Sequence, residues 1–297
     1  MTHKNLAAEG SPLVYQARLA LSTKTLTITV AAIRRYRTQV RCRWRKLPDV
    51  TVALIVLAAL RHDQRPADLA AAYDVSASSV RRWTWQITSV LAASAPRLSR
   101  VLRRVARHGG YAVILDGTLI PIPRPRRRRR RYRHYSGKHH GFGLLFLAIT
   151  DLRGNLLWIS AALPARTAEI TAARRYRIPA QLRAASLGAF ADLAYTRLDD
   201  QPGPADPACA PRPRGHLPGH PDDQPTIITG RRNANRRPLT AAQKSANQLL
   251  SRERAVGEHG FAHLKNWRIL HCLRGNHRHA TELLRALMIL TTTEITR

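Results

Sequence analysis

The spacing of apolar and polar residues predicts helices in the first third of the chain. Residues 52–60 make a short apolar helix, and Pro66 begins a second one because proline suits the first helical turn. Ser76, a residue type that caps helices, begins a third helix that runs to about Leu91. The apolar positions of this third helix recur at helical spacing and predict a buried face: Val80, Trp83, Ile87 and Val90.

The segment before these helices is mixed and weakly patterned. Within residues 19–30, threonines alternate with apolar residues, which predicts either a strand or an irregular arm. Arginines are frequent between positions 34 and 45, where they fit either a solvated face or a contact with a DNA backbone. We therefore expect residues 1–47 to form a basic, weakly structured arm.

After a basic segment at 96–110 that predicts a linker, the pattern changes to apolar runs of strand length. Residues 111–115, 143–150 and 155–162 predict three strands. The polar and glycine-containing residues 151–154 predict a hairpin turn between the last two of them.

Weaker elements and irregular segments occupy the middle of the chain. A helix is expected at 167–176, with short strands at 186–192 and 226–229. Residues 121–133 are mostly Arg and Pro, which predicts a loop or an arm rather than a packed element. Residues 199–225 are rich in Pro and Asp and predict a loop without a core of its own.

Two helices close the pattern. Thr240 and Gln243 form a capping box that opens a long helix over 240–265. A continuous leucine face predicts a final helix over 280–293. The whole pattern predicts an all-helical domain followed by a mixed-sheet domain, of α+β or α/β class, at 111–297.

The chain is strongly basic. Lys and Arg number 50 against 18 Asp and Glu, which gives a formal net charge of +32. This charge excludes a generic small-molecule enzyme and indicates a polyanionic partner, with nucleic acid favoured over an acidic membrane surface. Because 44% of the residues are apolar, the chain can also bury a sizeable core.

Cysteine usage and the N-terminus predict an intracellular protein. The three cysteines are widely spaced, which disfavours a zinc ribbon and a disulfide framework. The first residues lack the pattern of a secretory signal, and the apolar run at 52–60 is far shorter than the roughly 20 residues that span a bilayer. We expect a cytoplasmic, nucleoid-associated protein with no membrane partner.

A short helix, a tight turn and a second helix within residues 48–95 match the layout of a helix-turn-helix domain. In that motif the second helix enters the major groove with its first residues. Polar and basic side chains stand at those positions and form the expected DNA-contacting set: Ser78, Ser79, Arg81 and Arg82. An ordinary helical pair without DNA contact is the alternative.

Three carboxylates stand in structured contexts. Asp116 follows a strand directly, Asp192 ends a weak strand, and Glu258 lies on the long helix. Two strand ends and a helix can bring such groups together around two divalent cations, and oxygen ligands suit Mg²⁺, for which Mn²⁺ can substitute. Two ions about 4 Å apart activate the nucleophile and stabilise the leaving oxygen in phosphodiester displacement.

Helical spacing places one polar stripe along the long helix: Ser251, Arg254, Glu258, Phe261 and Lys265. In one interpretation Glu258 binds metal while Arg254 and Lys265 hold phosphate, and in the other these residues make surface salt bridges. Gly257 and Gly260 each cost a helix up to about 1 kcal/mol relative to Ala. They predict a place where a nucleic-acid backbone approaches closely.

Other candidate groups have simpler interpretations. His259 and His263 are one helical turn apart and can bind Zn²⁺, but no third ligand is evident, which favours a pair that either has hydrogen-bond partners within the protein or faces DNA. Asp151 is favoured as a turn former, and Glu169 is a reserve candidate that caps or flanks the site. The pair Lys138–His139 predicts a loop that contacts phosphate.

Several short motifs follow one another in a fixed order. They are D-G-T at Asp116–Thr118, Y-S-G-K-H at Tyr135–His139, L-L-W-I-S at Leu156–Ser160 and D-L-A-Y at Asp192–Tyr195. The long helix then carries Arg, three residues, Glu, six residues and Lys, with H-L-K-N-W-R continuing to Arg268. Over roughly residues 48–297 this set resembles the DDE-type transposases of bacterial insertion sequences, in the branch with an N-terminal helix-turn-helix.

The resemblance implies a ribonuclease-H-like domain in which Asp116, Asp192 and Glu258 bind two Mg²⁺ ions. The implied reaction is hydrolysis at the ends of the element, followed by attack of the freed 3′-OH on target DNA, with no small-molecule cofactor. The implied partners are double-stranded DNA, as terminal repeats and as target, and a second copy of the chain in a homodimer on DNA. Basic side chains of the signature would orient DNA phosphates: Arg254, Lys265 and Arg268.

The chain departs from the family pattern at a few positions. Ala194 stands where glycine is usual, Ser251 stands where tyrosine is common, and Ala168–Glu169 replace a frequent His-Asp pair. If position 194 requires a positive φ, alanine there costs about 1 kcal/mol or more. The alternative to an active transposase is therefore an inactive remnant, or a non-enzymatic helix-turn-helix protein that binds DNA.

Overall fold

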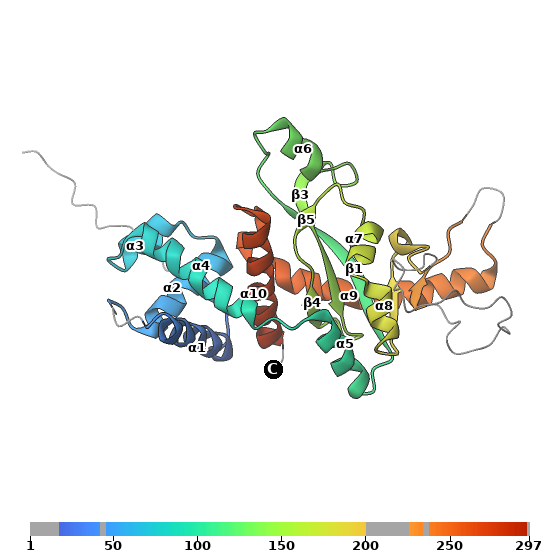
Figure 1. Cartoon of the computed structure of the whole chain (residues 1–297), viewed down its shortest axis with the longest axis horizontal. Coiled ribbons are helices and arrows are strands. Elements are labelled where there is room, and N and C mark those ends of the chain that lie inside the picture. The colour runs from blue at the N-terminus through green and yellow to red at the C-terminus, as the bar shows by residue number, and fades with distance from the viewer. Residues whose placement is uncertain (1–17, 42–45, 200–225, 234–237, 296–297) are drawn as a thin grey trace, which may run out of the picture.

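The structure, a computed structural model, describes residues 18–41, 46–199, 226–233 and 238–295. Within these ranges no helix is both long and apolar enough to span a membrane. Figure 1 shows a group of N-terminal helices, a mixed sheet, and helix α10 between them. The N-terminal group consists of α1 (Thr23–Gln39), α2 (Asp49–His62), α3 (Pro66–Ala72) and α4 (Ala77–Ala93).

Helix α1 stands where the sequence predicted a strand or an irregular arm, so that prediction is wrong for the described residues before 47. Its buried residues include Thr25, Thr29, Val30 and Ile33, which recur at helical spacing. The Thr29 hydroxyl donates to the Thr25 carbonyl at 2.8 Å, so a buried threonine is satisfied within the helix. Packing of this face against α2 and α4 outweighs the strand propensity of threonine.

Helices α2, α3 and α4 agree with the helices predicted between residues 48 and 95. The chain reverses between α3 and α4 at Asp74, which adopts a left-handed conformation with φ of 49°. Ser76 caps α4 as predicted, because its hydroxyl accepts from the Ser79 backbone N–H at 3.1 Å. A small apolar cluster joins the three helices: Ile55, Ala59, Leu69, Ala70 and Val80.

Helix α5 (Leu98–Arg107) occupies most of the segment that was predicted as a linker. Its apolar residues Leu98, Val101 and Leu102 are buried in the core that also contains residues of the sheet and α8. The linker prediction is wrong because these positions form one helical face, while the arginines between them remain exposed.

The predicted mixed sheet is present. Its strands are β1 (Ala112–Pro121), β2 (Tyr135–Ser136), β3 (Gly141–Thr150), β4 (Leu156–Ile159), β5 (Leu163–Pro164), β6 (Gly188–Ala191) and β7 (Ile227–Thr229). The main order is β2-β3-β1-β6-β7, and β4 and β5 also pair with β3. Strand β1 is antiparallel to β3 and parallel to β6, which is parallel to β7. β1 continues beyond its predicted end, so Asp116 lies within the strand.

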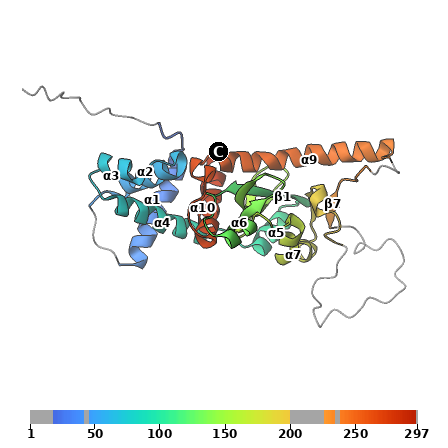
Figure 2. The same cartoon turned by 90° about the horizontal axis from the view of Figure 1, so that it is seen from above.

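Helices cover both faces of the sheet. Figure 2 shows α9 (Ala241–Lys265) on one face, called here the α9 face, and α5 and α7 (Glu169–Arg175) on the other, the α7 face. Helix α8 (Ile178–Arg183) packs with α5 and α7. The capping box of Thr240 and Gln243 that opens α9 is confirmed. Alternate residues of β3 serve the two cores, with Phe146 on the α9 face and Leu147 on the α7 face.

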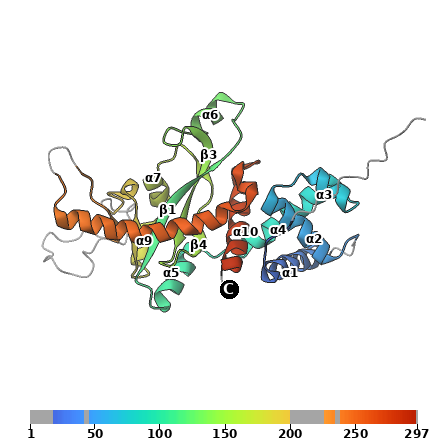
Figure 3. The same cartoon turned by 180° about the vertical axis from the view of Figure 1, so that it is seen from behind.

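Two glycines let α9 lie close to the sheet, as Figure 3 shows from behind. A Cβ at Gly257 would lie 2.9 Å from Ile114 Cγ2, and one at Gly260 would lie 2.7 Å from the Gly154 carbonyl oxygen. Both glycines are buried. They therefore serve helix–sheet packing, and the prediction that nucleic acid approaches at this point is wrong.

Helix α10 (His277–Ile295) connects the N-terminal helices with the sheet. It packs against α1 and α4 on one side and against β4 on the other. Its leucines, among them Leu284 and Leu287, belong to one apolar core that also contains Leu57 of α2 and Phe146 of β3. The Ser89 hydroxyl of α4 donates to Glu282 of α10 at 2.9 Å.

The arginine-rich segment 121–133 is not entirely irregular, because α6 (Arg128–His134) forms within it. His134 at the end of this helix is 7% exposed, and its Nε2 lies 2.7 Å from Nε2 of His277 in α10. This contact joins the end of α6 to α10. Of the Pro-rich loop predicted at 199–225, only Asp199 lies within the described residues.

Candidate active site

Asp116 and Asp192 lie next to each other on adjacent parallel strands. The last register pair between β1 and β6 joins Leu115 to Ala191, so each aspartate is the next residue on its strand. The Asp116 carboxylate accepts from the Gly117 backbone N–H at 2.8 Å. The Asp192 carboxylate accepts from the N–H of the following residue at 2.7 Å and caps a short 3₁₀ helix.

Both carboxylates belong to the α9 face. Ile114, which precedes Asp116 by one strand period, contacts Gly257 of α9, and side chains two residues apart share a face. Arg254 of α9 reaches Asp192, with Nη1 3.3 Å from Oδ1. This pair is only partly exposed, at 24% for Arg254 and 38% for Asp192, and it joins the long helix to the strand end.

The third predicted carboxylate, Glu258, lies on α9 one helical turn after Arg254. Its backbone neighbour Gly257 contacts β1, so this turn of α9 lies against the strand that carries Asp116. The side chain of Glu258 lies outside the described part of the chain.

The donor set suits a hard divalent cation. Asp116 and Asp192 offer oxygen ligands at partly exposed positions, which is the chemistry that Mg²⁺ and Mn²⁺ prefer. Among the described side chains, no three His, Cys, Asp or Glu residues are close enough together to hold an ion. The two aspartates are thus a fitting but incomplete ligand set, and the turn of α9 that carries Glu258 is where a third ligand is expected.

A fourth carboxylate, Glu169, lies on the α7 face of the same strand. A Cβ at Gly117 would lie 2.9 Å from Glu169 Cδ, so the glycine after Asp116 makes room for this side chain. Lys138 Nζ lies 3.7 Å from Glu169 Oε1. From the sequence, Glu169 was only a reserve candidate, and the glycine of the D-G-T motif was the signal that could have indicated its position.

Tyr195, three residues after Asp192, is fully buried in the core on the α7 face. Burial raises the pKa of its hydroxyl well above the ordinary range, and the negative charges of Glu169, Asp116 and Asp192 raise it further. The hydroxyl therefore remains a neutral hydrogen-bond donor at physiological pH.

Comparison with known families gives one match. The model of the DDE superfamily endonucleases matches residues 115–292. The chain belongs to the DDE superfamily endonucleases. No curated protein and no solved structure matches it. The matched region begins at the residue before Asp116 and includes Asp192 and Glu258, whereas the N-terminal helices lie outside it.

Membership of this family makes the protein a nuclease-type enzyme that acts on DNA, in a family whose members typically use divalent metals. The resemblance of the sequence to a DDE-type protein is therefore confirmed.

One departure from the family pattern is harmless in this DDE endonuclease. Ala194 is not among the described residues other than glycine that have a positive φ. It lies in the 3₁₀ helix Leu193–Tyr195, a conformation that alanine adopts without strain. The cost considered for alanine at this position therefore does not arise.

The polar stripe predicted on α9 is divided by burial. Phe261 is 5% exposed and belongs to the core, while Ser251 and Lys265 are exposed. Lys265 lies about 16 Å along the helix from Arg254. Arg268, in the 3₁₀ helix that follows, is also exposed. Of the predicted basic residues on this part of the chain, the structure brings Arg254 to Asp192 and leaves Lys265 and Arg268 on the surface.

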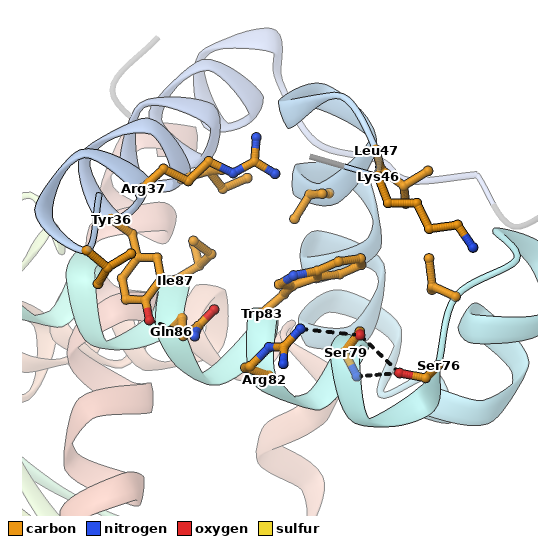
Figure 4. A pocket seen from close by; sticks show the side chains of 14 residues that line it. Tyr36, Arg37, Lys46, Leu47, Ser76, Ser79, Arg82, Trp83, Gln86 and Ile87 are labelled. Atoms are coloured by element: carbon orange, nitrogen blue, oxygen red, sulfur yellow. Dashed lines mark hydrogen bonds between the residues drawn. The ribbon is translucent and has the colours of Figure 1, made fainter. Parts of the chain in front are cut away.

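The predicted DNA-contacting residues of α4 lie apart from the carboxylates, on the N-terminal helices. Ser78, Arg81 and Arg82 are exposed, and Arg82 Nη2 donates to Ser79 Oγ at 3.4 Å. Figure 4 shows Ser79 and Arg82 at the edge of a cavity of about 460 Å³ between α1 and α4, with Trp83 on its wall. The start of α4 therefore presents hydroxyl and guanidinium groups on its surface.

Two other predictions have clear outcomes. Asp151 is a turn former as expected, since its carboxylate accepts from the Arg153 and Asn155 backbone N–H groups at 2.9 and 2.8 Å. His259 and His263 are exposed on α9. His139 is also exposed, beside Lys138 in a hollow of about 570 Å³ that Glu169 and Ala194 help to line.

Proposed function

We propose that this DDE endonuclease is the transposase of a bacterial insertion sequence. Asp116, Asp192 and Glu258 bind two Mg²⁺ ions, and the enzyme hydrolyses a phosphodiester at each element end and joins the freed 3′-OH to target DNA. The observation that carries this proposal is the Arg254–Asp192 pair, which joins the signature helix to the end of β6, beside the strand that carries Asp116.

The topology supports a ribonuclease-H-like arrangement of this domain. A long central strand, antiparallel to β3 and parallel to β6, carries the first carboxylate. The next parallel strand leads into the second carboxylate, and a long helix across the same face supplies the third position. This arrangement supports the proposal that three carboxylates from distant parts of the sequence form one site.

Asp116, Asp192 and Arg254 have different roles in the proposed reaction. The bound ions would supply an activated water and a stabilised leaving oxygen. The carboxylates of Asp116 and Asp192 accept hydrogen bonds from backbone N–H groups, so they are oriented before any substrate arrives. Arg254 has a buried Nε without a partner among the described residues, and it can turn its remaining donors to a DNA phosphate.

We infer that residues 48–95 read the terminal repeats through the first turn of α4. Replacing Arg81 and Arg82 with Ala should reduce the preference for terminal-repeat DNA over random DNA by about tenfold or more, because one good base contact discriminates by about 1–3 kcal/mol. Competition binding with the two DNA sequences measures this ratio. An unchanged ratio would show that α4 does not read bases.

Helix α6 supplies a second DNA-binding surface at the end of the sheet. Arg128, Arg129 and Arg130 are exposed, and the helix is anchored by the buried contact between His134 and His277. Burial lowers the pKa of His277, and the neighbouring His134 and arginines lower it further. A rigid, strongly basic projection of this kind fits a DNA backbone.

Replacing Arg128, Arg129 and Arg130 with Gln should make DNA binding less sensitive to salt. Each lost phosphate contact lowers the slope of log K against log salt by about 0.9, so a decrease of about 2 to 3 units is expected. The charge-matched control replaces Arg103, Arg104 and Arg107 of α5, at the opposite end of the sheet in Figure 1. Equal effects of the two triple variants would mean that only net charge matters.

Strand transfer distinguishes a transposase from a simple endonuclease. A labelled repeat end with a preformed 3′-OH, mixed with a supercoiled plasmid and Mg²⁺, should become covalently joined to the plasmid. The same reaction with EDTA, or with a 3′-dideoxy end, should give no joined product. Nicking of DNA without any joining would contradict the transposase proposal, and DNA binding without either reaction would indicate an inactive remnant.

A further inference from the structure

A charged cluster on the α7 face has no role in the proposed reaction so far. It consists of Glu169, Lys138 and the hydroxyl of Tyr195. Because strand side chains alternate between faces, Gly117 points away from the face that Asp116 occupies. The contact of Glu169 with the Cβ position of Gly117 therefore places Glu169 behind Asp116, across the strand. From this position Glu169 does not share an ion with Asp116.

The side chain of Glu169 is largely buried, while that of its basic partner Lys138 is exposed. The Glu169 side chain is 16% exposed and that of Lys138 is 67% exposed, with 3.7 Å between Nζ and Oε1. A largely buried carboxylate is costly unless a charge or a hydrogen bond compensates it. The ammonium group of Lys138 is thus drawn to the edge of the sheet but keeps donors free for another anion.

Tyr195 supplies the second support for Glu169. Its hydroxyl is buried, lies beside Glu169 and has no other hydrogen-bond partner among the described residues. An unsatisfied buried donor is unfavourable, and the adjacent carboxylate is the acceptor that the hydroxyl can use. The carboxylate of Glu169 consequently has two partners, the hydroxyl of Tyr195 and the ammonium group of Lys138.

We propose that Glu169 is a positioning residue that holds the Lys138 ammonium at the active-site edge, where it binds a DNA phosphate. Arg254, held by Asp192, has the corresponding place on the α9 face. The α7 face and the α9 face therefore each present one basic side chain that is paired with a carboxylate. The DNA backbone binds between these two basic side chains. This inference rests on the proposed function, because it takes DNA as the ligand.

A double-mutant cycle on Lys138 and Glu169 tests the proposal. Lys138→Gln and Glu169→Gln should each lower kcat/KM for nicking of repeat DNA about tenfold, and the double variant should be within about twofold of Lys138→Gln alone. Tyr195→Phe, which removes only the hydroxyl, should reproduce part of the Glu169→Gln loss. Arg175→Gln, an exposed charge on the same helix as Glu169, is the matched control and should leave kcat/KM unchanged.

Two results would overturn the proposal. Effects of the two substitutions that multiply would overturn the proposal, because Glu169 would then act without Lys138. Loss of a bound Mn²⁺ from Glu169→Gln in a calorimetric titration would also overturn it, since Glu169 would be a metal ligand. The same double-mutant cycle is also measured on DNA affinity in Ca²⁺. If the wild type binds DNA but does not nick it, the transposase proposal is refuted. The affinities in Ca²⁺ then still test whether Glu169 acts through Lys138.

Discussion

Replacing Asp116 with Asn is expected to lower metal-dependent nicking by about 10³-fold or more, with DNA affinity changed by less than about twofold. The substitution removes one anionic ligand, and a bound metal ion contributes several kcal/mol to stabilising the transition state. Asparagine keeps the shape of the side chain and can still accept from the Gly117 N–H, so the strand should not be disturbed. Single-turnover nicking in Mg²⁺ and binding in Ca²⁺ measure the two quantities.

The matched control for this variant is Asp151→Asn. Asp151 is also an aspartate whose carboxylate accepts backbone N–H groups, but it lies in the hairpin turn between β3 and β4. Its substitution should leave the nicking rate within about twofold of wild type. If Asp116→Asn instead retained nicking within tenfold of wild type, Asp116 would not be a metal ligand and the assigned site would be wrong.

The largest effect on stability is expected for Gly154→Ala. Gly154 has a φ of +82°, and a Cβ there would lie 2.5 Å from the Val256 carbonyl oxygen of α9. The left-handed conformation costs alanine about 1–2 kcal/mol, and overpacking against a backbone atom adds about 1–3 kcal/mol. The free energy of unfolding in urea should therefore fall by about 2–5 kcal/mol. Nicking should fall as well, because α9 carries Arg254 and Glu258.

Gly109→Ala separates the cost of the left-handed backbone conformation from the cost of overpacking. Gly109 has a φ of +75°, but nothing lies within 4 Å of the position that its Cβ would occupy. Its substitution should cost only the backbone term, about 1–2 kcal/mol, and leave nicking unchanged. Equal destabilisation by the two substitutions would show that α9 does not approach the β3–β4 turn as closely as the structure indicates.

Elements governed by local patterns were predictable from the sequence. The capping box of α9, the serine cap of α4 and the turn aspartate Asp151 all depend on residues within a few positions of one another, and all are confirmed. The apolar runs of strand length likewise indicated the strands of the mixed sheet. The prediction was less reliable where burial decides, as in α1, where threonines that suggested a strand face a helical core.

The candidate site shows the same limit. Asp116 lies in β1 and Asp192 directly follows β6, so their proximity could be expected once these two strands were paired. Why glycine stands at positions 257 and 260 could not be predicted, because it depends on how closely α9 crosses β1 and the β3–β4 turn. The place of Glu169 behind Gly117 depends on which face of the sheet α7 covers, and spacing along the chain does not determine that.

The most direct test of the account is cleavage of labelled DNA that carries the repeats flanking the gene of this protein. Wild type and Glu258→Ala are compared in Mg²⁺, in Mn²⁺ and in EDTA, with the position of each nick mapped to the nucleotide. The account predicts metal-dependent nicks at the repeat boundary that leave a 3′-OH and that Glu258→Ala does not make. Equal nicking by the two proteins, or nicking that persists in EDTA, would contradict a metal site built from Asp116, Asp192 and Glu258.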